Sequence, residues 1–248
     1  MSNFGQPLLR VEQLSKRFGG LKAVNSVSFD LHKGEILGLL GPNGAGKTTA
    51  FNLIAGFHRL DEGRVLLNGD DITGFTPNDI CHAGIARTFQ LSRPFGGLSA
   101  LENVMVGAFA RQKSAHEAKR SAEELLEFLG LTGRAHMDAS DLTAFDKRKV
   151  ELGRALATQP KLLLMDEVVA GATPSEAQEM VSLVRKVRDR GITVLIVEHV
   201  MKVIMGLSDR VIVMDQGALI ANGKPQDVVK DPRVLAAYFG EGYVSSDV

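Results

Sequence analysis

Residues 41–49 carry the clearest chemistry in the chain, because they match the phosphate-binding pattern G-x-x-x-x-G-K-[ST]. An apolar run at 35–40 precedes them, and the apolar spacing of 49–57 predicts a helix after them, which is the strand–turn–helix context that the pattern requires. Glycines let backbone N–H groups curl around phosphates, and the helix N-terminus adds positive charge. Lys47 can reach the outer phosphates and the Thr48 hydroxyl can bind Mg²⁺. The sequence therefore predicts a nucleoside triphosphate site formed by Gly41, Pro42, Asn43, Gly44, Ala45, Gly46, Lys47, Thr48 and Thr49.

Two adjacent acids, Asp166 and Glu167, end a second apolar run at 162–165. Such a run is typical of a strand buried on both faces of a parallel sheet, and ligands bind at the carboxyl ends of these strands. Asp166 is placed to hold Mg²⁺, directly or through water, and Glu167 could accept a proton from the attacking water. The alternative is that the two acids cap the start of a helix. The phosphate loop upstream favours the metal and catalytic roles.

Two further side chains have less specific signals. His199 follows a strand predicted at 192–197, where it could contact the γ-phosphate, although a lone histidine is more often structural. Phe18 stands beside Gly19 and Gly20, just upstream of the phosphate loop. Its ring could stack on a purine base or could cover the turn of a small sheet, and the local sequence favours neither role.

Composition limits the class of protein. The 248 residues can bury a full core, and the 29 basic and 29 acidic side chains leave no net charge that would indicate a nucleic-acid partner. One cysteine, Cys81, excludes an internal disulfide and fits a reducing compartment. We find no signal peptide pattern at the N-terminus, and charges interrupt the most apolar region, 192–207. The sequence predicts a cytoplasmic protein whose membrane role, if any, comes through a partner.

The order of predicted elements indicates an α/β core with an inserted helical lobe at 92–155, which follows a loop at 91–97. A turn at 15–20 separates the first two strands. The predicted strands and hairpins are 8–14, 23–31, 62–72 with a turn at Asn68-Gly69, 83–90, 161–167, 192–197 and 211–217. The predicted helices are 49–57, 101–110, 114–129, 175–190 and 226–240.

Taken together, these motifs resemble the nucleotide-binding subunits of ATP-binding-cassette (ABC) transporters, in the expected order and over nearly the whole chain. Phe18 matches the aromatic residue that stacks on adenine, and 41–49 match the phosphate loop. Gln90 matches the lid glutamine that senses Mg²⁺ and the transmembrane partner. Residues 162–167 match the strand with the Mg²⁺-linked aspartate and the catalytic glutamate, and His199 matches the switch histidine. GTPases and small-molecule kinases share the phosphate loop but not this combination.

The resemblance implies a single ABC ATPase domain over 1–248. Its fold would be an α/β phosphate-loop NTPase (RecA-like) core with a small antiparallel β subdomain, at 1–91 and 156–248, and an inserted α-helical subdomain at 92–155. It implies ATP and Mg²⁺ as cofactors, with Glu167, His199 and Lys47 catalytic. The metal site would use Thr48, Gln90 and Asp166.

As partners, the resemblance implies a second ATPase subunit, integral membrane permease subunits and, indirectly, a periplasmic solute-binding protein. The chain would be peripheral at the inner face of the plasma membrane.

One motif departs from the family. Where the family has LSGGQ, whose serine and glycines contact the partner subunit's ATP, this chain reads Leu142-Thr143-Ala144-Phe145-Asp146. Phe145 replaces a glycine, and its ring could obstruct the phosphate; Asp146 adds negative charge near an anion. Thr143 with Asp146 also resembles a capping box for the following helix. The chain therefore keeps Leu142, Thr143, Ala144 and Phe145 as its candidates for contacting ATP in trans.

Shorter motifs at 84–90 and 231–241 resemble the branched-chain amino-acid uptake branch, which typically has two different ATPase subunits. Branches for urea, amides or lipopolysaccharide share these motifs. An ABC-type regulatory module with little hydrolysis is the alternative that the altered signature favours and the intact Lys47, Asp166, Glu167 and His199 disfavour. A soluble ABC ATPase of DNA repair or translation lacks support, because such proteins need coiled-coil inserts or a second cassette.

Overall fold

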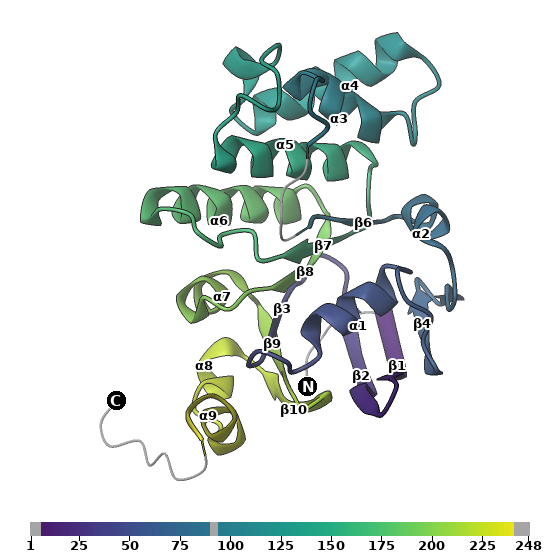
Figure 1. Cartoon of the computed structure of the whole chain (residues 1–248), viewed down its shortest axis with the longest axis vertical. Helices are drawn as coiled ribbons and strands as arrows, with labels where there is room; N and C mark the ends of the chain where they lie inside the picture. The colour runs from purple at the N-terminus through teal and green to yellow at the C-terminus, as the bar shows by residue number, and fades with distance from the viewer. Residues whose placement is uncertain (1–5, 90–93, 241–248) are drawn as a thin grey trace. The chain divides into compact units, whose positions relative to one another are not determined.

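The computed structural model describes residues 6–89 and 94–240. The chain divides into two compact units, residues 1–77 with 193–248 and residues 78–192. Figure 1 labels their helices and strands along the colour ramp. The chain leaves the first unit after β5 and returns to it at β8, so the second unit is an insertion in the sequence of the first. The boundaries predicted for the helical subdomain, 92–155, stay a prediction.

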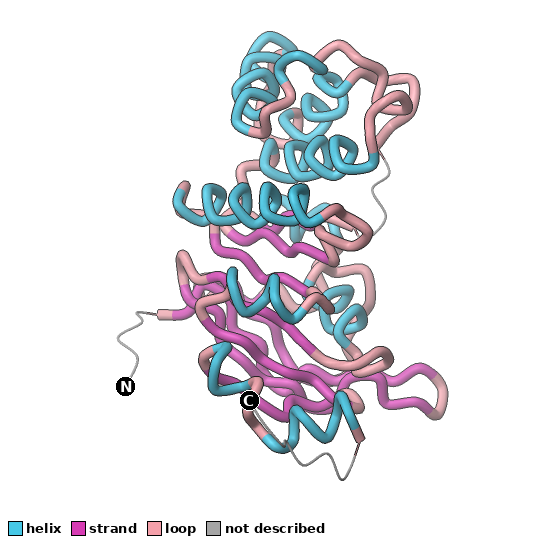
Figure 2. The backbone as a smooth tube through the Cα atoms, turned by 90° about the vertical axis from the view of Figure 1, so that its left-hand side faces the viewer, coloured by secondary structure: helices cyan, strands magenta, loops and turns pink. Residues whose placement is uncertain are grey.

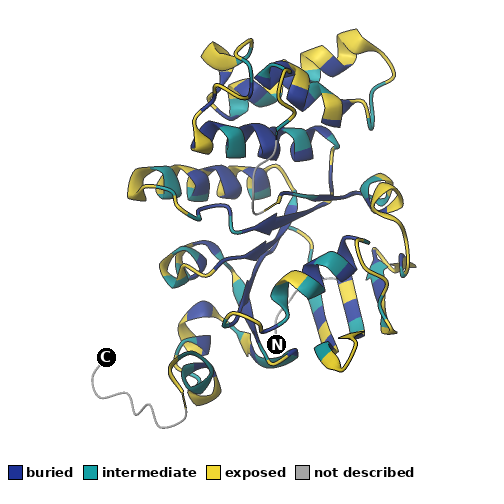
Figure 3. Cartoon of the chain, viewed as in Figure 1, coloured by how far each residue is buried: buried dark blue, intermediate teal, exposed yellow. Residues whose placement is uncertain are grey.

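A parallel sheet forms the centre of the first unit. β3 (Ile36–Leu40) pairs in parallel with both β8 (Thr193–Val197) and β9 (Arg210–Asp215), and β10 (Ala218–Gly223) pairs antiparallel with β9. Every residue of β3 and β8 is buried, as Figure 3 shows. Burial on both faces is why these strands are uninterrupted apolar runs and not alternating ones. Both strand predictions are confirmed.

Helix α1 (Lys47–Ile54) follows β3 through the phosphate loop. It begins and ends earlier than the predicted 49–57. It begins after Gly46, which has a φ of 97°, and it ends before Gly56, which has a φ of 76°. Because glycine adopts positive φ readily, these residues limit the helix at both ends. Phe51 is fully buried and anchors the helix.

A second, antiparallel sheet has the order β2-β1-β4-β5. Its strands are β1 (Pro7–Phe18), β2 (Leu21–His32), β4 (Glu62–Leu67) and β5 (Asp70–Asp71). The predicted hairpin turn is confirmed, with positive φ at Asn68 and Gly69. The predicted turn at 15–20 is wrong for 15–18, which extend β1. Asp61 explains the extension, because its carboxylate accepts hydrogen bonds from the Lys16 ammonium and the Arg17 backbone N–H.

Three short helices complete the first unit: α7 (Met201–Leu207), α8 (Pro225–Val228) and α9 (Pro232–Phe239). The single helix predicted at 226–240 is therefore two. Pro232 cannot continue a helix that comes before it, whereas it suits the first position of a new one, and the Asp231 carboxylate caps that helix by accepting from the Arg233 N–H at 2.8 Å. Helix α7 was not predicted.

The second unit combines a parallel strand pair with helices. β6 (Ile85–Arg87) pairs with β7 (Leu162–Asp166), and the helices are α2 (Pro77–Ala83), α3 (Ala100–Ala108), α4 (Ala115–Phe128), α5 (Ala144–Ala157) and α6 (Pro174–Asp189), with a 3₁₀ turn at Thr132–Arg134. Helices α3, α4 and α5 pack on one another as an all-helical region, which Figure 2 shows in cyan. The helices predicted at 101–110 and 114–129 are confirmed. In the part of the chain that the structure describes, no helix is long and apolar enough to cross a membrane.

Candidate nucleotide-binding site

The phosphate loop has the backbone that its glycines predict. Gly41, Gly44 and Gly46 all have positive φ, at 150°, 80° and 97°. A Cβ on Gly41 would lie 2.2 Å from the Met214 carbonyl oxygen, and a Cβ on Gly46 would lie 2.3 Å from that of Ala23. Both distances are far inside van der Waals contact. Glycine is thus required at both positions for conformation and for space.

The charges of the loop suit an anion. The Lys47 ammonium donates to the carbonyl oxygens of Gly41 and Pro42, at 2.7 and 2.9 Å, and this holds the charge over the loop. Gly46 is the N-cap of α1 and has no side chain that could cap the helix. Because the first N–H groups of a helix have no acceptor within the helix, this end of α1 suits a phosphate, and the helix dipole adds to the attraction.

His199 lies at the same sheet edge as the phosphate loop. β3 and β8 run in parallel with Leu39 opposite Val197, so Gly41 and the Glu198–His199 pair both follow the carboxyl ends of their strands. Glu198 is buried and His199 is exposed. The structure therefore brings the loop and His199 to one edge, as the sequence predicts.

Phe18 lies at the end of β1 with its side chain 45% exposed. The His58 ring contacts it edge-on, with centroids 5.4 Å apart, and the Lys16 ammonium lies 5.7 Å from its centroid. A ring that remains so exposed is available to a base. Its stacking on adenine stays a prediction.

In the second unit, β7 ends in the buried Asp166. Its carboxylate pairs with the Arg87 guanidinium of β6 at 3.0 Å, and both side chains are at least nine-tenths buried. The parallel register, with Arg87 opposite Leu164, brings the arginine to the same edge as the two acids. Because a buried carboxylate needs a partner, the pairing with Arg87 offsets the cost of burying Asp166 and orients its side chain. No local sequence pattern marks Arg87 for this role, since the contact joins residues far apart in the chain.

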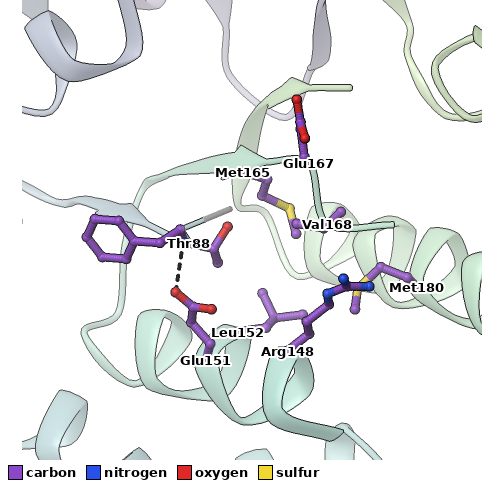
Figure 4. Close-up of a pocket in the computed structure, with 9 residues that line it drawn as sticks. Thr88, Arg148, Glu151, Leu152, Met165, Glu167, Val168 and Met180 are labelled. Atoms are coloured by element: carbon purple, nitrogen blue, oxygen red, sulfur yellow. Dashed lines mark hydrogen bonds between the residues drawn. The ribbon is translucent and has the colours of Figure 1, made fainter. Parts of the chain in front are cut away.

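Glu167 has a backbone conformation that is rare for its type. Its φ is 49°, in the left-handed region, which costs about 1 to 3 kcal/mol for a residue other than glycine. Such strain is concentrated at functional sites. In Figure 4 the Glu167 carboxylate points away from Arg148 and Leu152, with which it lines a small pocket. It is half-buried and remains accessible.

The two acids do not cap a helix. Helix α6 begins farther along, where Thr173 is the N-cap and Glu176 completes a capping box. Hydrogen bonds from the Thr173 backbone N–H and hydroxyl lower the pKa of Glu176. The alternative role considered for Asp166 and Glu167 is therefore excluded.

Helix α5 contacts the chain on both sides of this site. The Glu151 carboxylate, which is buried, accepts from the Phe89 backbone N–H at 2.8 Å (dashed in Figure 4). Arg148 donates to the Ala170 carbonyl oxygen in the loop after Glu167. Gln90 itself lies outside the described residues, so its predicted role is untested. Sequence reasoning missed Arg148 and Glu151, which no local pattern marks.

Comparison with known proteins identifies the family. Residues 24–170 match the model of the family described as ABC transporter. The chain belongs to the ABC transporter family. Its C-terminal residues 218–244 also match a model described as branched-chain amino acid ATP-binding cassette transporter.

The chain is 40% identical to the high-affinity branched-chain amino acid transport ATP-binding protein LivG of Escherichia coli K12, with 95% of this chain and 99% of that protein covered. It is 38% identical to the protein BraF of Pseudomonas aeruginosa, which has the same description, over 95% of this chain and 99% of that protein. The ATP-binding and ATP-hydrolysing activity predicted from the motifs is thus the activity of this chain's family.

Solved ABC cassettes confirm the fold. A nucleotide-free ATP-binding cassette from an ABC transporter matches with a TM-score of 0.87 at 36% identity, over 95% of this chain and all of that one. A cassette in its ADP conformation matches with the same TM-score and identity, over 96% of this chain and all of the other. The predicted fold class, an α/β core with an antiparallel β subdomain and a helical subdomain, is that of this ABC ATPase.

The altered ABC signature is held by hydrogen bonds and ion pairs centred on Asp146. Thr143 is the N-cap of α5, and its hydroxyl accepts from the Asp146 N–H at 3.1 Å and donates to the Asp146 carboxylate at 2.8 Å. Asp146 is 2% exposed and pairs with Arg134 at 2.6 Å and Lys149 at 3.5 Å. The sequence suggested a capping box, and its first bond is confirmed, because the Thr143 hydroxyl accepts from the Asp146 backbone N–H. Aspartate stands here in place of the usual glutamate.

The Phe145 ring does not lie exposed, as it would have to do in order to obstruct a phosphate. Its ring is packed inside the unit, with the residue 7% exposed and the Lys149 ammonium 5.1 Å from its centroid. The ring thus does not project toward an approaching phosphate. Of the trans candidates, Leu142 and Phe145 are buried, while Thr143 and Ala144 are exposed.

The Thr143 cap gives a first testable expectation. Replacing Thr143 by alanine should lower the free energy of unfolding by about 1 kcal/mol, because it leaves an α5 N–H uncapped. Urea unfolding followed by circular dichroism measures the change. Thr132→Ala, at an exposed position of the same unit, is the matched control and should change stability by less than about 0.5 kcal/mol. Equal stability of the two variants would show that the Thr143 hydroxyl contributes nothing.

Proposed function

We propose that this ABC ATPase powers the uptake of branched-chain amino acids. The observation that carries the proposal is the likeness to LivG and BraF over nearly the full length of both chains. The C-terminal match, which is to a branched-chain model and not to ABC transporters at large, supports the same branch. The short motifs also allowed transport of urea, amides or lipopolysaccharide, and these alternatives are less well supported.

In the proposed mechanism, this chain binds ATP between the phosphate loop and the exposed ring of Phe18. Lys47 and the α1 N-terminus hold the β- and γ-phosphates, and Glu167 orients water and takes its proton. His199, from the same edge as the loop, stabilises charge that develops on the γ-phosphate.

The residues present also suit Mg²⁺. Thr48 and Asp166 offer oxygen atoms, which this ion prefers. Among the described residues, no group of three or more His, Cys, Asp or Glu side chains could hold a metal ion without the nucleotide. This fits an ion that takes most of its ligands from phosphates and water. When bound, Mg²⁺ would neutralise phosphate charge.

We further propose that the chain works with a second, different ATPase subunit. At the start of α5 the Asp146 carboxylate already occupies the positive end of the helix, and Arg134 and Lys149 neutralise it. A partner's γ-phosphate would find less attraction there than at an LSGGQ segment. In a heterodimer, the partner's signature completes the site at this chain's loop, and segment 142–146 makes a weaker site for the partner's ATP.

The membrane subunits and the solute-binding protein complete the proposed system. ABC ATPases of transporters act on permease subunits in the membrane. We place this chain at the cytoplasmic face of the plasma membrane through those subunits, with residues 91–98 and the helical region as the contact surface. A periplasmic binding protein would deliver the amino acid.

Uptake by the reconstituted transporter tests the proposed solute. Proteoliposomes that contain this chain, its second ATPase subunit, the permease and the binding protein should accumulate leucine, isoleucine and valine when ATP is enclosed. Urea and acetamide, offered to the same vesicles, are the matched solutes that should not enter. Accumulation of either one without branched-chain amino acids would contradict the proposal.

Substituting the catalytic glutamates in turn tests the asymmetry. In the heterodimer, Glu167→Gln should remove nearly all hydrolysis, and the same change in the partner should remove a small part. Initial rates of phosphate release measure both. Equal losses from the two substitutions would refute unequal sites. A heterodimer that binds ATP but shows no hydrolysis with both glutamates intact would favour the regulatory module.

A further inference from the structure

The C-terminal helix α9 contributes a side chain to the phosphate loop. The Tyr238 hydroxyl accepts a hydrogen bond from the Gly41 backbone N–H, with 2.8 Å between nitrogen and oxygen. Gly41 is the first residue after β3 and the first of the loop. Both residues belong to the first unit. None of the nucleotide-site motifs includes Tyr238, although it lies in the stretch that matches the branched-chain model.

Gly41 is held on several sides. Its carbonyl oxygen accepts from the Lys47 ammonium at 2.7 Å, and the Met214 carbonyl oxygen fills the space where a Cβ would be. The Tyr238 hydroxyl holds the N–H. The peptide group on each side of Gly41 is therefore fixed, one by tyrosine and the other by the lysine that will meet the phosphates.

Other parts of the C-terminal segment hold the same loop. The Gly217 N–H, in the turn between β9 and β10, donates to the Ala45 carbonyl oxygen at 3.1 Å. The Gly217 carbonyl in turn accepts from the Asn25 N–H at 2.8 Å. Helix α9 contacts β10, and its Val234 is buried. The loop is thus supported at its start by α9 and farther on by the β9–β10 turn.

Tyr238 is chemically suited to a fixed hydroxyl. Burial raises its pKa above the usual value, and the hydrogen bond from Gly41 lowers it by less. The phenol therefore stays neutral at physiological pH. The Tyr238 side chain is half-buried. At the other end of the helix, the Arg233 guanidinium pairs with the Asp231 carboxylate at 2.7 Å. A neutral, rigidly mounted phenol has two rotatable side-chain bonds and holds its partner at little entropic cost.

From these contacts we propose that Tyr238 is a positioning residue for nucleotide binding, which it assists by fixing the Gly41 peptide in the shape that receives the phosphates. The proposal rests on ATP binding at this loop. Because the hydroxyl touches backbone and no reacting atom, its loss should weaken the binding of ATP and ADP alike and leave the chemical step unchanged.

The test compares Tyr238→Phe, which removes one oxygen atom, with Phe239→Leu, which alters an exposed neighbour on the same helix and keeps the hydroxyl. Titration of the full chain with a fluorescent ADP analogue should show binding about threefold to tenfold weaker in Tyr238→Phe, the value of one lost neutral hydrogen bond. Phe239→Leu should bind as the wild type does. In the assembled ATPase, KM should rise by the same factor with kcat unchanged within about twofold.

Hydrogen exchange at the Gly41 amide gives a direct readout. Its rate in the nucleotide-free protein, followed by NMR, should increase at least about tenfold in Tyr238→Phe and stay constant in Phe239→Leu. Unchanged ADP affinity in Tyr238→Phe, or an equal loss in both variants, would overturn the inference alone. Failure of the wild-type chain to bind ADP would overturn the proposed function as well.

Discussion

Replacing Glu167 by glutamine is expected to slow ATP hydrolysis at this chain's own phosphate loop about a thousandfold while ATP still binds, because the amide cannot take a proton from water. Glutamine has nearly the same size, so the left-handed backbone at this position should persist. The phosphate loop lies in another part of the sequence and is untouched. Loss of turnover without loss of affinity is the signature of a group that acts on the attacking water.

Phosphate release at saturating ATP and equilibrium binding of ATP together measure this effect. The working heterodimer should be used, so that the site is complete, and the partner's catalytic glutamate should be replaced by glutamine throughout, so that the partner's site does not contribute. Glu123→Gln, an exposed acid on α4, is the matched control and should hydrolyse ATP as the wild type does. Normal turnover in Glu167→Gln would remove Glu167 as the base.

Replacing Phe145 by alanine is expected to destabilise the protein by about 3 kcal/mol, because truncating a buried ring loses its packing and leaves a cavity. The contact between the ring and the Lys149 ammonium is lost as well. Glycine, the family's residue here, would be worse, because it costs about 1 kcal/mol more than alanine in a helix. The loss of packing around the Phe145 ring, and not the distance of the ring from a nucleotide, should therefore determine the effect of this substitution.

Thermal and urea unfolding measure the loss. Phe109→Ala, at an exposed phenylalanine of the same unit, should change stability by less than about 0.5 kcal/mol. We also expect no rise in hydrolysis by Phe145→Ala, since the buried ring obstructs nothing. A stable variant with faster hydrolysis would show that the ring lies in the site after all.

The elements that could be predicted from sequence are those with a local cause. The strands β3, β7 and β8 are short apolar runs because both faces are buried, and the turn at Asn68-Gly69 depends on two residues that adopt positive φ. The phosphate loop needs its glycines for backbone reasons alone. Its shape therefore follows from residues close together in the chain, whereas the edge that it shares with His199 depends on the parallel pairing of β3 with β8.

The features that sequence did not predict are made by contacts between distant residues. Strand β1 extends through Phe18 because Asp61 holds its end. The pairing of Arg87 with Asp166 and the contact of Tyr238 with Gly41 join residues from opposite parts of the chain. The burial of Phe145 depends on how α5 packs, so its position was invisible in the motif that it alters. Gln90 lies outside the described residues and its role stays a prediction.

The claim that segment 142–146 makes a weak site can be tested by steady-state ATP hydrolysis. The purified chain is measured first alone and then with a second ATPase subunit that has an intact LSGGQ segment. We expect slow hydrolysis by the chain alone, because both sites of a homodimer would use segment 142–146. We expect an increase of about tenfold or more on pairing, when the partner's backbone donors complete the site at this chain's phosphate loop. Full activity of the chain alone, with no increase from the partner, would contradict the account.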